Sequence, residues 1–545
     1  MLVLWEEETM SRIVSWAAAA LAAALIAAGC GGSSTTNTGS GGGGTANQGP
    51  AKAGGTMTVA LAEDPDLLDP TLARTFVGRI VFANLCEKLY DVNDKLQIVP
   101  QLAASMPKIS NGGKTVTIDI RQGLKFNDGT TMDAKAVKTS LDRHRNLDAS
   151  ARASELEPVK SVKVVDSDTV RLTLDAPYAP LAAQLADRSG MIMSPKQLSK
   201  LGDKFSNDPV CVGPFQFVSR KEGDQIVLKK APDYYDASKV KLDRLVFRII
   251  DESNARSANL RSGDVNVAER LQPTDLAQIR ADSNLQLLNR TSLGYQGLTI
   301  NVGNKNGLGK PFKNVGTPLA QHKELRQALS LSLDRNAINK VVFQGNFVPG
   351  CGPLSPVSPY YNKSFKCPGR DIAKAKQLVQ QSGVPTPIPV KLMLNTDAVT
   401  LRLGQTIQAM AKEAGFNVQL QPTEFTSALD KGDAGDFDTF QLGWSGRIDP
   451  DGNIQQFAGT TGSQNDSGYS NPALDKVLEQ GRTELDPARR TQIYQQATQM
   501  IMDDAPLIYI YHDVYYTGLG KNVTGLKFYG DGLLRLKEAG FTASS

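Results

Sequence analysis

Short runs of alternating hydrophobic and polar residues are separated along the chain by runs with helical spacing. Residues 56–61, Thr-Met-Thr-Val-Ala-Leu, alternate as a half-buried strand does. Residues 78–90 carry apolar side chains on one helical face, and Asp133 is placed to cap a helix through residue 143. Further strands are predicted at residues 115–120, 162–165, 169–174, 225–229 and 245–250. Because strands and helices alternate without an internal repeat or heptads, the pattern predicts an α/β fold.

The hydrophobic run at residues 13–29 is uncharged and ends directly before Cys30. A membrane span needs about 20 apolar residues, so this run has the length of a signal-peptide core instead. Three glutamates precede Met10, which makes Met10 the better start because a signal peptide begins with basic residues. The end of the run, Ala-Ala-Gly-Cys, resembles a bacterial lipobox, although Ala27 stands where leucine is usual. We expect lipidation of Cys30; the alternative is cleavage by an ordinary signal peptidase.

Residues 31–54 consist almost entirely of small and polar residues. Such a segment cannot bury a core, and about 25 such residues reach roughly 25 to 30 Å as a flexible chain. We expect a tether that holds a folded body at the outer face of a membrane.

The charge balance excludes nucleic-acid binding through bulk charge. The 545 residues contain 60 Lys+Arg against 56 Asp+Glu, a formal net charge of +4. Nucleic-acid binders concentrate basic residues to neutralise phosphates. A hydrophobic content of 40% with 21% charged residues also excludes a disordered chain and a multi-span membrane protein.

Four cysteines besides Cys30 suit two disulfides in an oxidising compartment. Cys351 and Cys367 lie 16 positions apart among prolines and are our preferred pair. Cys86 and Cys211 then pair or remain buried thiols. A metal site is not expected, because the chain has no CxxC spacing and no histidine near these cysteines.

Neither candidate catalytic motif has the spacing that its chemistry requires. The phosphate-loop candidate at residues 112–115 has Lys108 where its first glycine is required, and a hairpin turn is the better interpretation. In Gly-Trp-Ser-Gly at residues 443–446, the second glycine falls one position too early for a nucleophile elbow. With only three histidines in the chain, His512 is taken as structural or as a residue at the rim of a site. We expect neither an enzyme nor a cofactor.

Short segments spread over the body resemble segments of one known protein family, and they occur in the same order as in that family. They are residues 68–70, 85–91, 100–103, 121–130, 133–143, 213–215, 262–267 and 325–335. Together they resemble the extracytoplasmic solute-binding proteins of ABC importers, in the peptide/nickel-binding family (family 5). No segment is diagnostic alone, but their common order is specific.

The resemblance implies a two-lobed periplasmic-binding-protein clamshell (type II, cluster C) with an additional third domain. The N-terminal pattern assigns residues 1–30 to a signal peptide with lipobox and 31–54 to the tether. The resemblance assigns residues 55–88, 204–292 and 506–545 to domain I, 89–203 to an extra domain II and 293–505 to the second lobe, domain III. It further implies a monomer, anchored outside the cytoplasmic membrane, that closes around a solute by a hinge and delivers it to ABC permease subunits. Neither nucleic acid nor a metal is an expected partner.

The family's dipeptide binders use a Trp-containing loop whose Asp pairs with the peptide ammonium. Here Trp444 is retained, but Arg447 stands at the Asp position. The family's upstream arginine, which pairs with the peptide carboxylate, falls near Asp397. A guanidinium prefers carboxylate or phosphate, so Arg447 suits an anionic group and repels a free amine. Two alternatives remain: Asp449 or Asp451 takes the amine, or Arg447 pairs with one of them and only shapes the loop.

Three further residues complete the predicted binding set. Asn453 belongs to the Trp444 loop, and Tyr295 and Asn301 match the strand that borders the family's solute cleft. Trp444 is expected to form an aromatic platform for solute, with core packing near the hinge as the alternative.

Two classes of function follow. The first is a binding lipoprotein for peptides or peptide-like solutes, or in the same role for a non-peptide solute that is opine-like, sugar-derived or a metal chelate. The second is a surface lipoprotein whose cleft serves adhesion, chaperoning or signalling.

Overall fold

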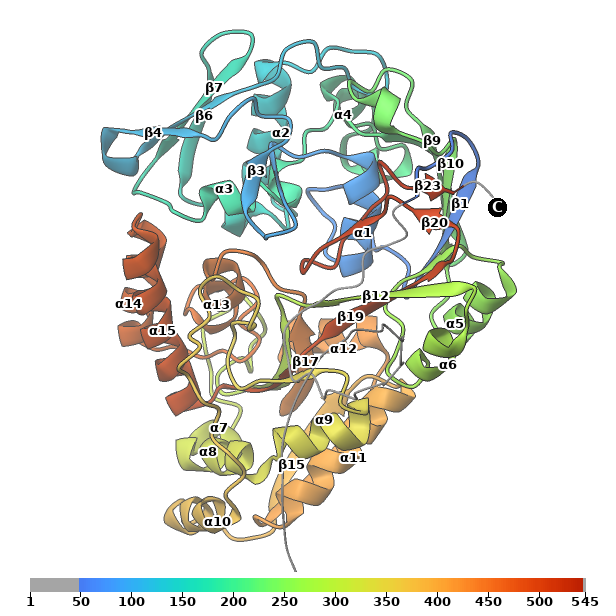
Figure 1. Ribbon diagram of the computed structural model, residues 1–545. Helices are drawn as coiled ribbons and strands as arrows, with labels where there is room; N and C mark the ends of the chain where they lie inside the picture. The colour runs from blue at the N-terminus through green and yellow to red at the C-terminus, as the bar shows by residue number, and fades with distance from the viewer. Residues whose placement is uncertain (1–48, 543–545) are drawn as a thin grey trace, which may run out of the picture. The chain divides into compact units, whose positions relative to one another are not determined.

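The computed structural model describes residues 49–542, which fall in one compact unit (Figure 1). The predicted signal peptide, Cys30 and most of the tether lie outside the described residues. The last residues of the predicted tether are bonded to the body: Lys52 N donates to Phe541 O at 2.8 Å, and Gly54 N donates to Lys241 O at 2.7 Å. The body therefore begins before residue 55, the start that the sequence pattern suggested.

Within these residues, the predicted strand at 56–61 becomes the middle of a seven-stranded sheet. β1 (Thr56–Leu61) runs parallel to both β10 (Arg244–Ile249) and β11 (Val267–Ala268). It buries Met57 and Val59 completely, as the alternating pattern requires. The remaining strands are β8 (Phe215–Lys221), β9 (Gln225–Lys230), β12 (Leu285–Thr291) and β19 (Val514–Gly520), in the order β12-β19-β11-β1-β10-β9-β8.

A second, six-stranded sheet is built from the later part of the chain. Its strands are β13 (Tyr295–Ile300), β14 (Val348–Pro349), β15 (Ile388–Leu394), β16 (Phe416–Pro422), β17 (Thr439–Trp444) and β18 (Leu507–His512), in the order β14-β18-β13-β17-β15-β16. β18 pairs with β13, so residues 507–512 belong to this sheet. The predicted start of the last domain I piece at residue 506 is thus too early, since the chain leaves this sheet only after His512.

A four-stranded antiparallel sheet lies within the range predicted for domain II. Its strands are β4 (Lys108–Ser110), β5 (Thr115–Asp119), β6 (Val159–Val164) and β7 (Thr169–Leu174), in the order β4-β5-β7-β6. The helix predicted after Asp133 is α2 (Ala134–Asn146), and the Asp133 side chain accepts a hydrogen bond from Ala136 N at 3.0 Å. Short two-stranded pairs are formed by β2 (Tyr90–Val92) with β3 (Ile98–Pro100), β20 (Val523–Thr524) with β23 (Gly540–Phe541), and β21 (Lys527–Phe528) with β22 (Leu534–Arg535).

The first helix, α1 (Phe76–Leu85), is shorter than the predicted 78–90 and begins earlier. Thr75 caps its start, and the chain turns away at Cys86 because the segment before Phe215 crosses the helix end. A Cβ on Gly213 would lie only 2.1 Å from Leu85 O, so this crossing requires glycine.

The other helices cover the sheets or connect their strands (Figure 1). In chain order they are α3 (Leu181–Gln184), α4 (Pro195–Leu201), α5 (Ser253–Ser262), α6 (Leu276–Ala281), α7 (Pro318–Gln321), α8 (Lys323–Ser332), α9 (Arg335–Phe343), α10 (Ile372–Gln381), α11 (Ala398–Lys412), α12 (Phe425–Ala434), α13 (Asp451–Ala458), α14 (Pro472–Thr483) and α15 (Pro487–Asp504). None of the helices within residues 49–542 has the length and apolar character needed to cross a membrane.

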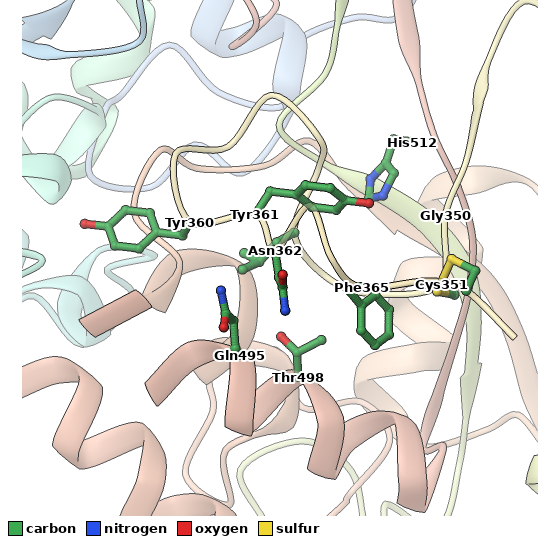
Figure 2. Close-up of a pocket in the computed structure, with 12 residues that line it drawn as sticks. Gly350, Cys351, Tyr360, Tyr361, Asn362, Phe365, Gln495, Thr498 and His512 are labelled. Atoms are coloured by element: carbon green, nitrogen blue, oxygen red, sulfur yellow. A yellow bond between two sulfur atoms is a disulfide. The ribbon is translucent and has the colours of Figure 1, made fainter. Parts of the chain in front are cut away.

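Two disulfides are present in the described chain. Cys351 and Cys367 are bonded with a Cα–Cα distance of 5.5 Å, and Cys86 and Cys211 with 5.0 Å. The first closes a loop that, together with α15 and His512, lines a small and mostly apolar pocket (Figure 2). The second joins the end of α1 to the segment that crosses it, which decides the question that the sequence left open for these two cysteines.

The chain passes between the seven-stranded and six-stranded sheets at two adjacent places. β12 continues into β13 through residues 292–294, and β18 continues into β19 through Asp513. Ser292 N donates to Asp513 O at 2.8 Å, and the His512 imidazole Nδ1 lies 2.7 Å from Gly294 O. The two crossings are therefore hydrogen-bonded to each other where the chain passes between the sheets.

Candidate functional site

The Trp444 loop begins where β17 ends, close to the two crossings. Trp444 lies opposite Tyr295 in the β13–β17 pair. Asn453 holds the loop from within: its side-chain oxygen accepts from Trp444 Nε1 at 3.1 Å and from Arg447 N at 2.7 Å, while its amide donates to Arg447 O at 2.8 Å. Asn453 is fully buried, so its role in this structure is to fix the positions of Trp444 and Arg447.

Arg447 is buried and pairs with Asp187, a residue far from it in the sequence. Its guanidinium carbon lies 4.3 Å from the centre of the Trp444 ring, and its Nε lies 3.1 Å from an Asp187 carboxylate oxygen. Burial lowers the pKa of Arg447 to about 10, with Asp187 opposing the shift. Arg447 remains charged at neutral pH, and its partner is not the Asp449 or Asp451 that the sequence suggested.

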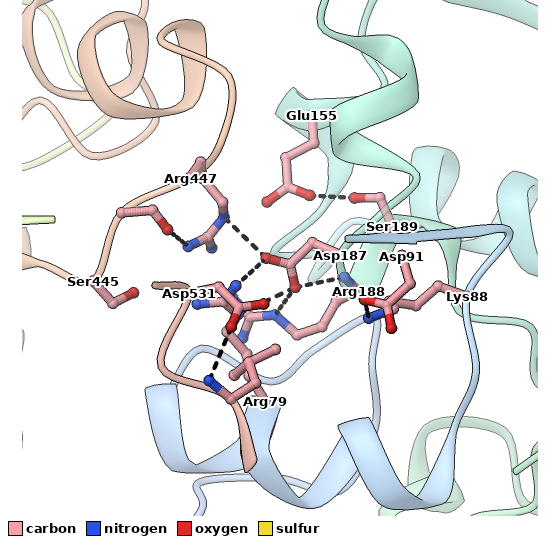
Figure 3. Close-up of polar contacts among 12 residues, drawn as sticks. Arg79, Lys88, Asp91, Glu155, Asp187, Arg188, Ser189, Ser445, Arg447 and Asp531 are labelled. Atoms are coloured by element: carbon pink, nitrogen blue, oxygen red, sulfur yellow. Dashed lines mark hydrogen bonds and ion pairs between the residues drawn. The ribbon is translucent and has the colours of Figure 1, made fainter. Parts of the chain in front are cut away.

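Six charged side chains form what we call the Arg447 cluster: Arg79, Arg152, Glu155, Asp187, Arg188 and Arg447. Figure 3 labels all of them except Arg152. Each of the six is at most 7% exposed. Asp187 is its centre, because Arg79 Nη2 also lies 2.8 Å from this carboxylate. Burial alone would raise the pKa of Asp187, but Arg79, Arg447 and Arg188 outweigh burial and hold it well below its ordinary value. Four guanidinium groups facing two carboxylates leave the cluster with a formal charge of +2.

Several guanidinium nitrogens in this cluster lack a hydrogen-bond acceptor. Arg188 donates through Nη1 to Ala73 O at 2.7 Å, and Arg152 through Nη1 to Glu155 at 2.5 Å. Within residues 49–542, however, Arg79 Nη1, Arg152 Nε and Arg188 Nε are buried and make no hydrogen bond. Buried donors are costly to leave unpaired, so an acceptor supplied from outside the chain would stabilise this arrangement.

The two acidic residues of the Trp444 loop each interact with an arginine from the same predicted domain, residues 293–505. Asp449 receives two hydrogen bonds from Arg490, at 2.5 and 2.7 Å. Asp451 lies 3.5 Å from Arg482 Nε and accepts from Tyr494 at 3.3 Å; burial raises its pKa to about 6, with Arg482 opposing. Both carboxylates thus have arginine partners of their own.

Asn301 and Asp397 also form local structure. Asn301 is fully buried, and its amide donates to the carbonyls of Gly435 and Phe437, each at 3.1 Å. Asp397 is exposed and caps α11, accepting from Val399 N and Thr400 N. Neither residue lies among the contacts of the Arg447 cluster.

Tyr295 belongs to a group that the sequence did not reveal. Its hydroxyl is buried without a hydrogen-bond partner among the described residues, as is that of Tyr509, whose ring centre lies 4.8 Å away. Burial, and then Tyr509 and Asp466, raise the pKa of Tyr295 well above its ordinary value. Nothing in the sequence spacing of Asp466, or of the five cluster residues outside the Trp444 loop, marks them as members of a site. In the part of the chain that is described, no group of His, Cys, Asp and Glu side chains could hold a metal ion.

Residues 97–465 match the model of the bacterial extracellular solute-binding proteins, family 5. The chain belongs to this family. A similar relative is the glutathione-binding protein GsiB of Salmonella paratyphi A, 28% identical over 496 residues that cover 87% of this chain and 92% of GsiB.

Two solved structures are similar over 90% of this solute-binding protein. The periplasmic binding protein DppA from Helicobacter pylori, in complex with the peptide STSA, has a TM-score of 0.80 at 24% identity and is covered to 98%. AgaA from A. tumefaciens R10, in complex with agropinic acid, has a TM-score of 0.79 at 26% identity and is covered to 99%. The predicted fold class, two lobes with an additional domain, is therefore confirmed.

Proposed function

We propose that this protein is the substrate-binding lipoprotein of an ABC importer and captures a peptide-like solute that carries a negatively charged group. The observation that carries the proposal is the formal surplus of buried positive charge in the Arg447 cluster, where three guanidinium nitrogens make no hydrogen bond within residues 49–542. The similarity to a glutathione-binding relative supports it, since glutathione is a peptide-like anion.

The position of the cluster supports recognition coupled to closure. Arg447 follows the strand that ends at Trp444, Arg79 lies on α1, and Asp187 precedes Arg188 after α3. Each of the three predicted domains thus contributes to one buried set of charges. A solute carboxylate held there would touch all three, and its binding energy would favour the closed arrangement over an open one.

The unpaired donors allow an estimate of how much solute affinity depends on each contact. A hydrogen bond to a charged group contributes about 1.5–3 kcal/mol, and each 1.4 kcal/mol changes affinity about tenfold. Loss of one such contact should weaken binding by roughly 10- to 150-fold.

The proposal also states how the protein delivers its solute to the permease outside the cell. Lipidation at Cys30 would hold the protein at the outer face of the cytoplasmic membrane, and the tether would keep the monomeric body near its permease subunits. Hinge closure around the solute would then change the surface that the permease meets.

A second candidate solute is an opine-like anion, favoured by the similarity to AgaA with agropinic acid. Such a solute shares the carboxylate but not the peptide backbone. The same binding experiment separates it from a peptide.

Isothermal titration calorimetry of the full-length protein tests the proposal. Glutathione, its dimethyl ester and agropinic acid are titrated into the wild type, Arg447→Met and the control Arg370→Met, whose arginine pairs with Glu413 at the surface. We expect the anionic solute to bind the wild type, the ester to bind at least tenfold more weakly, and only Arg447→Met to lose this preference. Equal binding of acid and ester, or unchanged affinity in Arg447→Met, would overturn the anionic-group proposal.

A further inference from the structure

Residues 154–187 of predicted domain II reach across to predicted domain III at several points. One of these points is the Arg447 cluster. A second lies at the C-terminal end of α14, where Ala179 N donates to Arg482 O at 2.8 Å. At a third, Ser154 Oγ donates to Ser463 Oγ at 3.2 Å. The chain itself makes these contacts, so they fasten the two domains together whichever solute the protein holds.

The backbone hydrogen bond at Arg482 satisfies a carbonyl that α14 does not pair within itself. The last four carbonyls of an α-helix have no donor inside the helix, and Arg482 lies in the last turn of α14. The donor, Ala179 N, belongs to the segment between β7 and α3. Separation of the two domains would break this bond and expose both groups to water. The bond therefore marks the closed arrangement.

The side chain of Arg482 strengthens the same contact. Its guanidinium carbon lies 5.1 Å from the centre of the Tyr178 ring, within the range of a cation–π interaction. The Arg482 side chain is 15% exposed and Tyr178 is 5% exposed, so the stacked pair is largely shielded from water. Arg482 Nη2 also lies 3.7 Å from Glu157 Oε2, but this carboxylate is 70% exposed and adds little.

Arg482 connects this contact to the Trp444 loop. Its Nε lies 3.5 Å from Oδ1 of Asp451, the first residue of α13. Burial alone would lower the pKa of Arg482, but Asp451 and then Tyr178 outweigh burial and hold it above its ordinary value. Arg482 therefore remains charged, between a carboxylate of its own domain and an aromatic ring of predicted domain II.

A pair between predicted domains I and III is more exposed. Arg74, just before α1, lies 3.3 Å from Asp433 in α12, and their side chains are 57% and 36% exposed. Water and salt screen such a pair, so it contributes little to holding the domains together. The shielded contact of predicted domain II with α14 is the stronger of the two.

We propose that residues 154–187 act as a clasp on α14 and that Arg482 is its positioning residue. By stacking on Tyr178, the Arg482 side chain holds the backbone hydrogen bond from Ala179 in place. Predicted domain II thus sets how often the protein opens. Since the apparent affinity for a solute that binds only the closed arrangement rises with the fraction of molecules that are closed, the clasp affects every such solute alike.

Hydrogen–deuterium exchange at the Ala179 amide, resolved by fragmentation mass spectrometry, measures opening of the clasp. The full-length protein is used without added solute, and native mass spectrometry verifies that it carries none. Tyr178→Leu, Arg482→Met and the double variant are compared with the wild type. The control is Tyr529→Leu, whose ring lies 4.6 Å from the Arg535 guanidinium within predicted domain I.

We expect the Ala179 amide to be protected in the wild type and in Tyr529→Leu, and to exchange at least about threefold faster in each single clasp variant. Because Tyr178 and Arg482 act through one contact, the double variant should exchange about as fast as the faster single variant. Amides of β1 should exchange equally in all variants, which distinguishes opening of the clasp from loss of the fold.

Three results would overturn the clasp. They are exchange of the wild-type Ala179 amide at the rate of an unstructured peptide, unchanged protection in both single variants, and effects that multiply in the double variant. If the variants of the buried residues fail to fold, as thermal melting would reveal, Glu157→Lys replaces them, because its position is exposed. Its like charge beside Arg482 should speed exchange at least about twofold, and unchanged exchange would then overturn the inference. Since no solute is added, the outcome is independent of the solute preference proposed above.

Discussion

Replacing Asp449 by asparagine tests whether a buried ion pair holds the Trp444 loop in place. Arg490 donates two hydrogen bonds to Asp449 and a third, through Nε, to Gly481 O at 2.7 Å. Asp449 Oδ1 also accepts from Asp451 N at 3.0 Å, and asparagine keeps a carbonyl oxygen for that contact. The substitution therefore removes the charge while preserving the shape of the turn.

The expected loss of stability is large, because the guanidinium remains buried. Arg490 and Asp449 have side chains only 4% and 8% exposed. Removing one partner of a buried ion pair costs about 3–5 kcal/mol, because the remaining charge is left without compensation. If residues 293–505 melt as one unit with about 2.1 cal/mol/K of unfolding entropy per residue, the melting temperature falls by roughly 7 to 11 °C.

Differential scanning calorimetry at neutral pH measures this shift. Glu413→Gln serves as a control, since it breaks an exposed pair with Arg370 in the same lobe and should cost less than about 1 kcal/mol. The double variant Asp449→Leu/Arg490→Met should recover much of the loss, because it removes both buried charges. A melting temperature of Asp449→Asn within about 1 °C of the wild type would refute the reasoning.

Three other substitutions test further features of the fold. Asp466→Asn should raise stability at pH 7.5 but not near pH 4: the folded carboxyl titrates at about pH 7 and the unfolded one near 4, so the wild type loses stability as the pH rises between them. Urea titrations at both pH values measure this, and an equal gain at both contradicts it. Gly294→Ala places a Cβ 1.8 Å from Trp444 O and should cost at least about 1–3 kcal/mol, seen as a lower melting temperature; an unchanged one argues against close packing at the hinge. The double variant Cys86→Ser/Cys211→Ser opens a loop of 125 residues and should lose about 5 kcal/mol in chemical denaturation against the oxidised wild type, a prediction that matching curves would exclude.

Local features of the sequence determined a good part of the fold. Alternation predicted the strands at 56–61 and 169–174, and the Asp133 cap predicted the start of α2, because these signals lie within a few residues of the structure that they specify. Helix α1 was placed less well: its end is decided by a segment far along the chain that crosses it at Gly213.

The sequence predicted only the part of the candidate site that lies in the Trp444 loop. The sequence singled out Trp444 and Arg447 because they stand in one recognisable loop, and it led us to expect a preference for an anionic group. It could not pair Arg447 with Asp187, because nothing in the spacing of the two residues connects them, and it therefore left Asp449 and Asp451 as possible partners.

The sequence by itself determined the family, the α/β composition and the inversion of charge in the Trp444 loop, since each of these is written in contiguous residues. Only the tertiary structure decided which charges are buried together, which carboxylates already have an arginine, and that Asp466 Oδ1 and the hydroxyl of Tyr295 have no hydrogen-bond partner within residues 49–542. The physical reason is that electrostatic interaction depends on distance through space and on exclusion from water, and both are set by chain crossings that bring remote segments into contact.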